Sequence, residues 1–134
     1  MDCKDLMIYD YIKYNGVTKI VDAVYLYSVS VHDPSEEWSI SEAKTYSIDD
    51  IEPIELTEDI LVKNGFEKST RVGTYELNTD YYEIEVWDYS DGLWVVKVQY
   101  IEFSSLPYSQ ATITHVHALQ HLLRLCGIDM ELTI

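Results

Sequence analysis

The sequence predicts an α+β fold in a single domain spanning residues 1–134. Three observations support this fold class. Valine- and tyrosine-rich segments separated by turn residues fill about residues 8–48. A hairpin pattern occupies residues 81–103, and an amphipathic helical pattern closes the chain. We therefore expect a β part at about 8–48 and a helix–hairpin–helix part at about 50–128.

The β part is expected to form a strongly bent antiparallel sheet or SH3-like half-barrel, because several short strands follow one another closely. Its clearest signal is Asn15-Gly16, which lies between Tyr14 and Val17. A two-residue hairpin turn of this kind needs positive φ at both central residues, which Asn and Gly tolerate. The segment therefore predicts a hairpin centred on these two residues.

Two further segments complete the predicted β part. VDAVYLYSVSV (21–31) has the valine and tyrosine content of a strand. After the turn HDPSEE (32–37), the segment WSISEAKTYSI (38–48) places Trp38 and Ile40 between polar neighbours. This alternation predicts another strand.

A short helix of about two turns is predicted after the acidic stretch DDIEPIEL (49–56). Thr57 suits the N-cap, and Glu58 and Asp59 follow in the first turn, where the helix dipole favours anions. Gly65 suits the left-handed position just after the helix. Helix capping accounts for these acids better than a metal site does, since they lack the spacing of a calcium-binding loop.

The segment YYEIEVWDYSDGLWVVKVQYIEF (81–103) predicts a hairpin whose register follows from the pattern of its two faces. With SDG (90–92) as a three-residue loop, Val86 lies opposite Val96 and one face is apolar throughout. A two-residue loop would instead set Val86 against Lys97 and mix the faces. The other expected pairs are Tyr82–Tyr100, Glu83–Gln99, Ile84–Val98, Glu85–Lys97 and Trp87–Val95.

The final helix is predicted to begin near Thr112 and to end before Gly127, which suits the left-handed C′ position. At 100° per residue, one apolar arc consists of Val116, Leu119, Leu122, Leu123 and Cys126. His117, His121 and Arg124 fall on the opposite side. This helix is expected to pack on the sheet and to expose those three side chains to water.

The spacing of His117 and His121, four residues apart, is also that of a two-histidine metal site. Ala118, however, stands where the metalloprotease pattern has a glutamate, and the helix supplies no acidic ligand. An ordinary solvated helix face is the favoured interpretation, anion binding is the main alternative, and no metal is expected.

The region between Glu102 and Asp129 contains no acidic residue, although the chain is strongly acidic. It carries three histidines, an arginine and several hydroxyl groups, and helix N-termini bind anions readily. A buried helix, or one that packs against an acidic partner, would explain the same composition. The residues predicted to face an anionic ligand are Tyr108, Ser109, Gln110, Thr112, His117, His121 and Arg124.

The charge of the chain limits its partners. Nine Lys and Arg against 24 Asp and Glu give a formal net charge of -15. Direct binding to a nucleic-acid backbone is not expected, because that requires a cationic face. An anionic membrane is not expected as a partner for the same reason. The simpler interpretation of this charge is that it keeps the protein soluble. The more specific interpretation is that the protein mimics a nucleic acid.

Catalytic motifs are missing from the sequence. It contains no GxSxG elbow and no glycine-rich phosphate loop, and Cys3 and Cys126 lie far apart without a metal-binding spacing. We therefore expect a non-enzymatic protein without a cofactor. The acidic N-terminus does not resemble a secretory signal, so a cytoplasmic location with reduced thiols is expected.

Three segments together resemble a family of short uncharacterised proteins from phages and mobile elements of gut Bacteroidetes. They are IEPIELTEDILVKNGFEK (51–68), YYEIEVWDYSDGLWVVKV (81–98) and THVHALQHLLRLCGI (114–128). That family shares an IPLT-type start, an ILEKNGF-type helix and a final VHxLQ-type helix, and the resemblance covers about residues 50–128.

The resemblance implies a small protein made in the cytoplasm of an infected bacterium. We expect a counter-defence factor that sequesters a nucleotide-type immune signal, with a homo-oligomer as the usual arrangement for such a pocket. The alternative is a protein–protein inhibitor or an acidic nucleic-acid mimic that blocks a host immune protein.

Overall fold

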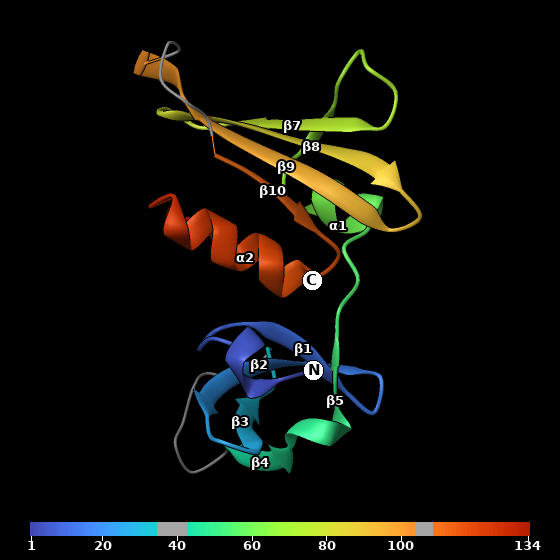
Figure 1. The fold of residues 1–134 in the computed structure, drawn as a ribbon, viewed down its shortest axis with the longest axis vertical. Helices are drawn as coiled ribbons and strands as arrows, with labels where there is room; N and C mark the ends of the chain where they lie inside the picture. Colours follow the sequence, from blue (N-terminus) through green and yellow to red (C-terminus); the bar gives the residue numbers. More distant parts are fainter. Residues whose placement is uncertain (35–42, 104–108) are drawn as a thin grey trace. The chain divides into compact units, whose positions relative to one another are not determined.

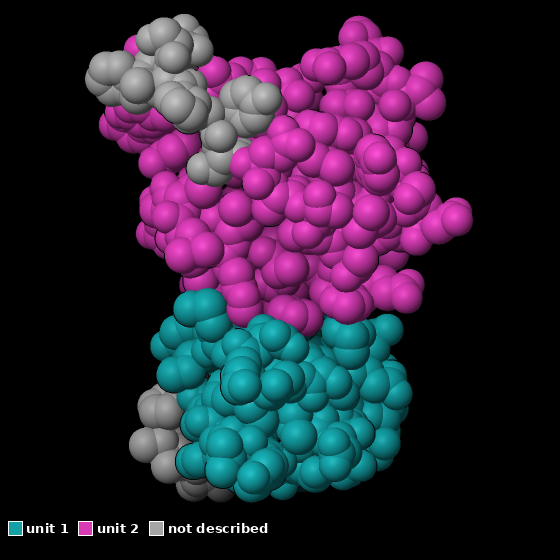
Figure 2. Space-filling model, in the orientation of Figure 1, with its two compact units in different colours: residues 1–54 teal, residues 55–134 magenta. Residues whose placement is uncertain are grey.

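A computed structural model describes residues 1–34, 43–103 and 109–134 of the chain. Within these residues it has two antiparallel five-stranded sheets and two α-helices, which confirms the predicted α+β class. The chain divides into two compact units, Met1–Ile54 and Glu55–Ile134 (Figure 2). This boundary lies close to the expected junction of the two parts of the sequence, and the description of the whole chain as one domain stays a prediction.

Unit 1 contains an antiparallel sheet with the strand order β4-β3-β2-β1-β5 (Figure 1). Its strands are β1 (Tyr11–Tyr14), β2 (Val17–Val24), β3 (Ser28–His32), β4 (Lys44–Ser47) and β5 (Ile51–Pro53). Two 3-10 helices accompany them, η1 (Cys3–Asp5) and η2 (Ile48–Asp50). The buried apolar side chains that form the core of this unit are Leu6, Ile12, Val21, Val29, Val31, Ile48 and Ile51.

The predicted hairpin at Asn15-Gly16 is confirmed. These two residues connect β1 to β2 with φ angles of 49° and 75°, and Tyr14 pairs with Val17 beside them. Both central residues therefore have the positive φ that a two-residue turn with the right-handed twist of a hairpin requires.

The segment 21–31, predicted as one strand, is instead divided between the end of β2 and β3, because a turn at residues 25–27 reverses the chain. β4 (Lys44–Ser47) covers the end of the segment 38–48 in which a strand was expected. Trp38 and Ile40, on which that expectation also depended, lie outside the described residues. The SH3-like description of this part stays a prediction.

Unit 2 contains the second sheet, with the order β10-β9-β8-β7-β6, and α2 lies across one of its faces (Figure 1). Its strands are β6 (Glu67–Lys68), β7 (Thr74–Asn78), β8 (Tyr82–Ser90), β9 (Leu93–Tyr100) and β10 (Ser109–Ile113). Its helices are α1 (Glu58–Lys63), the 3-10 helix η3 (Ile101–Phe103) and α2 (Val116–Leu125). The buried apolar side chains of the central strands and α2 include Ile84, Val86, Val96, Val98, Val116, Leu119 and Leu123.

Both predicted ends of α1 are confirmed. The Thr57 hydroxyl accepts a hydrogen bond from the backbone N–H of Ile60, at 3.4 Å. At the other end Gly65 has a φ of 89°, and the N–H of Phe66 donates to the carbonyl of Leu61 at 3.1 Å. These are the contacts of an N-cap and of a Schellman motif, so neighbouring residues in the sequence determine where α1 begins and where it ends.

All six predicted pairs between β8 and β9 are present, but the predicted three-residue loop is wrong. Ser90 pairs with Leu93, so the turn consists of Asp91 and Gly92, with φ angles of 32° and 80°. Tyr89 is an extra residue in β8, where the register shifts. A one-residue bulge next to a two-residue turn gives the same offset between strands as a three-residue loop.

The predicted start of the final helix near Thr112 is also wrong. Residues 109–113 form β10, which pairs with β9 from Ser109–Val98 to Ile113–Trp94. The open edge of β9 can take another strand, and a β-branched segment suits it better than the first turn of a helix. The end of α2 is as predicted, with Gly127 at a φ of 73°.

The buried face of α2 differs from the predicted apolar arc. Val116, Leu119 and Leu123 are buried as expected, but Gln120 and His117 are buried as well, while Leu122 and Cys126 of the predicted arc are only half-buried. At 100° per residue Gln120 lies 40° and His117 100° from Val116, so the buried face is centred near Val116, with Gln120 inside it and His117 at its edge. The expectation that His117 lies on a solvated face is therefore wrong.

Candidate ligand-binding site

The structure separates the residues that were predicted to face an anion. Tyr108 lies outside the described residues, and Ser109, Gln110 and Thr112 lie on β10 rather than in a loop before a helix. Gln110 pairs with Lys97 of β9, and both Gln110 and Thr112 are exposed. A helix N-terminus does not point into a hydroxyl-rich loop here, because the helix begins only after this strand.

The two histidines of the predicted surface, His117 and His121, do lie together, and His115, which was not part of that prediction, lies beside His117. The ring centroids of His115 and His117 are 5.5 Å apart, and those of His117 and His121 are 5.7 Å apart. His117 is 7% exposed, whereas His121 and Arg124 are half-buried. The three rings thus form a row along the first turns of α2. Anion binding by His117 and His121 stays a prediction.

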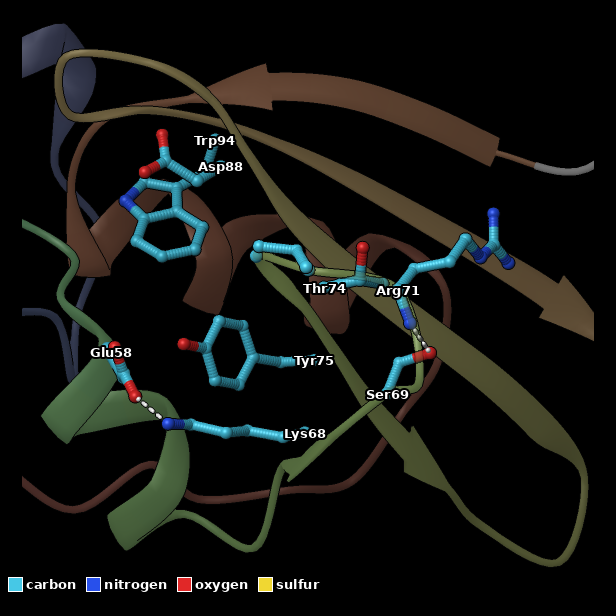
Figure 3. A pocket seen from close by; sticks show the side chains of 10 residues that line it. Glu58, Lys68, Ser69, Arg71, Thr74, Tyr75, Asp88 and Trp94 are labelled. Carbon is cyan, nitrogen blue, oxygen red and sulfur yellow. Dashed lines mark hydrogen bonds and ion pairs between the residues drawn. The ribbon is translucent and has the colours of Figure 1, made fainter.

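A cavity of about 470 Å³ lies in unit 2, away from the residues predicted to bind a ligand. Residues from α1, from the four neighbouring strands β6 to β9 and from the connection between β6 and β7 line it (Figure 3). The lining residues are Glu58, Lys68, Ser69, Arg71, Val72, Gly73, Thr74, Tyr75, Asp88 and Trp94.

One wall of this cavity is aromatic. The rings of Tyr75 and Trp94 meet edge to face, with centroids 6.0 Å apart and an interplanar angle of 61°. Both residues are nearly buried, at 5% and 6% exposed. The indole N–H of Trp94 donates to the backbone carbonyl of Leu56 at 3.0 Å. Since packing holds both rings and this hydrogen bond also holds that of Trp94, the wall exists before any ligand arrives.

An ion pair lies beside the aromatic wall. Lys68 Nζ is 2.8 Å from a carboxylate oxygen of Glu58, and Figure 3 shows the Tyr75 ring between this pair and the indole of Trp94. The hydrogen bonds from Lys68 and from the Tyr75 hydroxyl lower the pKa of Glu58. The hydrogen bond to Glu58, and then the charge of Glu58, raise the pKa of Lys68. Burial, followed by the hydrogen bond to Glu58, raises the pKa of Tyr75. The three groups therefore favour a charged pair next to a neutral phenol at neutral pH.

The second cation of the cavity lies in the connection between β6 and β7. Arg71 is mostly exposed, and its guanidinium is 3.6 Å from a carboxylate oxygen of Glu85. The N–H of Thr74 donates to the carbonyl of Arg71 at 3.2 Å, and Gly73 turns the chain with a φ of 71°. This turn holds the backbone of Arg71 at the cavity while its side chain extends into solvent.

The lining combines an aromatic wall, two cations, two acids and three hydroxyl groups, one of them that of Tyr75. These groups suit a small molecule that has a flat ring, hydrogen-bonding groups at its edge and a negative charge. Cysteine and histidine do not occur among the lining residues. Among all the residues that the structure describes, no three His, Cys, Asp or Glu side chains are placed to hold a metal ion together.

The prediction from sequence missed this cavity because most of its lining comes from residues 67–78, to which no element was assigned. The alternation of Tyr75 and Leu77 with polar neighbours after Gly73 is the signal that would have indicated a strand there. Sequence alone does not indicate that Glu58, Asp88 and Trp94 meet this strand.

No helix among the described residues combines the length and the apolar character needed to cross a bilayer. Comparison of the chain with protein-family models, with curated proteins and with solved structures gives no match.

Proposed function

We propose that this is a non-enzymatic binding protein whose cavity in unit 2 holds a small nucleotide-type ligand. The observation that supports this most is the convergence of an aromatic wall with Lys68 and Arg71 around about 470 Å³. Cavities of roughly 300–1,000 Å³ are typical for small ligands. The volume suits a mononucleotide or a molecule of similar size.

Each part of a nucleotide has a partner of suitable chemistry in the lining. The base would lie against Tyr75 and Trp94, which present ring edges and apolar surface. Its amino groups, or the ribose hydroxyls, would donate to the carboxylates of Glu58 and Asp88. The phosphate would take the guanidinium of Arg71, which binds such groups through two parallel hydrogen bonds.

The net charge of -15 opposes an anionic ligand at long range. Physiological salt screens this repulsion beyond about 8 Å. Within the cavity the two cations balance the two acids. Binding therefore depends on local contacts rather than on attraction from a distance, and we expect a slow approach and a modest affinity that changes little with salt.

The biological role that we propose rests on the resemblance to short phage and mobile-element proteins. In an infected bacterial cytoplasm, a small protein that holds a nucleotide without reacting with it would lower the free concentration of an immune signal. Counter-defence by sequestration is thus the role that fits both the cavity and the resemblance.

A second candidate function is inhibition of a host immune protein, including mimicry of a nucleic acid. The observation in its favour is the excess of 24 acids over 9 basic residues. A mimic would need its acids on a continuous surface rather than a ligand in a cavity.

The test begins with native mass spectrometry of protein purified from bacteria, followed by thermal denaturation with mononucleotides and cyclic mono- and dinucleotides. We expect a stabilisation of several degrees by at least one nucleotide, since a ligand at about 100 times its Kd adds about 2.7 kcal/mol. Arg71→Ala should abolish it. Lys63→Ala removes the same charge from α1 outside the cavity and should not.

The remaining outcomes separate the candidates. A stabilisation that survives Arg71→Ala and is lost in Arg124→Ala would place the ligand on α2 and refute the cavity. A clean apo mass with no stabilisation by any nucleotide would refute nucleotide binding, and the inhibitor of a host protein would become the leading candidate.

A further inference from the structure

The turn between β2 and β3 exposes three consecutive large apolar side chains. Tyr25, Leu26 and Tyr27 are 54%, 75% and 75% exposed. Scattered apolar residues are normal on a protein surface, but a contiguous group of this kind is a feature of interaction sites. Two of the three are tyrosines, which dominate binding energy at interfaces.

The backbone of this turn is fixed by hydrogen bonds. The N–H of Tyr25 donates to the carbonyl of Ser28 at 2.8 Å, which closes the turn. The N–H of Ile48 donates to the carbonyl of Tyr27 at 3.0 Å, which ties the turn to the start of η2. A partner would therefore meet a largely preformed backbone, and ordering it would cost little on binding.

The charge next to this turn is negative. Asp49 and Asp50 follow Ile48 directly, and both are exposed. The N–H of Asp49 is held by the hydroxyl of Ser47 at 3.4 Å. The only basic residue of β4, Lys44, pairs with Val31 at the far end of the strand from the Ser28–Ser47 pair. Two acids therefore lie beside the aromatic turn, and the lysine of β4 is too far along the strand to neutralise them.

We propose that the Tyr25–Tyr27 turn, together with Asp49 and Asp50, binds a lysine- and arginine-rich segment of a partner protein. Guanidinium and ammonium groups are attracted to the faces of exposed tyrosine rings. The two carboxylates supply the opposite charge, and the net charge of -15 would steer a basic partner towards the protein. This surface lies in unit 1 and does not depend on the cavity in unit 2.

Titration of the ¹⁵N-labelled full chain with a synthetic peptide of alternating arginine and glycine tests the proposal. We expect amide shifts concentrated at residues 25–28 and 47–50. Leu26→Ser combined with Tyr27→Ser should weaken binding about two- to fivefold, in keeping with the loss of an exposed tyrosine–cation contact. Tyr89→Ser, at an equally exposed tyrosine of unit 2, is the matched control and should leave the affinity unchanged.

A second pair of variants separates a specific site from general attraction to an acidic protein. Asp49→Asn with Asp50→Asn should weaken binding more than Asp129→Asn with Glu131→Gln, which removes the same charge from exposed positions of unit 2. Equal effects of the two pairs, or shifts spread over all acidic segments, would overturn the proposal. Self-association through the turn with no response to the peptide would overturn it too.

Discussion

Replacement of Trp94 by phenylalanine tests whether the aromatic wall of the cavity is held by a hydrogen bond. Trp94 is 6% exposed, and its indole N–H donates to the Leu56 carbonyl at 3.0 Å across 38 positions of sequence. Leu56 itself donates its N–H to the carbonyl of Thr114. Phenylalanine keeps an aromatic ring at the position but removes the donor, so a buried carbonyl would lose its partner.

The expected loss of stability follows from two effects. A buried carbonyl left without its hydrogen bond costs about 1–3 kcal/mol. The smaller ring also leaves a gap and loses apolar burial, which adds about 1 kcal/mol. The sum is a destabilisation of about 2–4 kcal/mol. With a urea dependence of about 2 kcal/mol per molar, the unfolding midpoint should fall by about 1–2 M.

The assay is urea unfolding followed through the amide signals of Val96 and Val98, which report on unit 2 alone. Trp87→Phe is the matched control, because Trp87 is only half-buried on the neighbouring strand. It should cost no more than about 1 kcal/mol. Equal destabilisation by the two substitutions would refute the reasoning, since the hydrogen bond to Leu56 would then contribute nothing measurable.

Two other predictions follow from the geometry of unit 2. The pKa of Glu58 lies below its ordinary value of 4.5, so its stabilising contribution is present above that pH and is lost as the pH falls through the lowered pKa. Glu58→Gln should therefore lower the melting temperature at pH 7 and flatten its decline in acid; an unchanged acid profile would contradict this. Deletion of Tyr89 should remove the bulge and leave the two-residue turn with the same register, at a cost of less than about 1 kcal/mol. A collapse of the cross-strand contacts between Glu85 and Lys97 in the deletion variant would show that the bulge is required.

The prediction from sequence was most accurate for strand register, where the apolar face and the polar face of a hairpin both required the same pairing. In the hairpin of β8 and β9, the alternation of apolar and polar residues admits one register, and a shift by one would place Val86 against Lys97. The register was therefore correct although the turn was not. Positive φ at a glycine fits both a three-residue loop and a two-residue turn, so Gly92 alone did not distinguish them.

The errors occurred where a tertiary contact overrode a local preference. The helical period of the last segment extends back towards Thr112, but the edge of β9 takes that stretch as a strand. Gln120 lies inside the face that α2 buries and His117 at its edge, positions that a polarity pattern assigns to solvent.

The cavity could not be predicted for a different reason. Its residues come from four separate stretches of the chain, and Tyr75 lies near Asp88 and Trp94 only because β7 pairs with β8 and β8 pairs with β9. Lys68 and Arg71 appear in the sequence as ordinary surface cations. Both line the cavity because of the turn before β7, and the sequence of that turn contains no recognisable motif.

The outer strands of the two sheets have a consequence for behaviour at high concentration. Among the described strands, β6 ends the second sheet with only Glu67 and Lys68, and β5 ends the first with three residues that finish at Pro53. A short, charged edge and an edge closed by a residue without an N–H are poor templates for a further strand. At these two edges the protein is thus protected against the strand-by-strand growth that leads to fibrils.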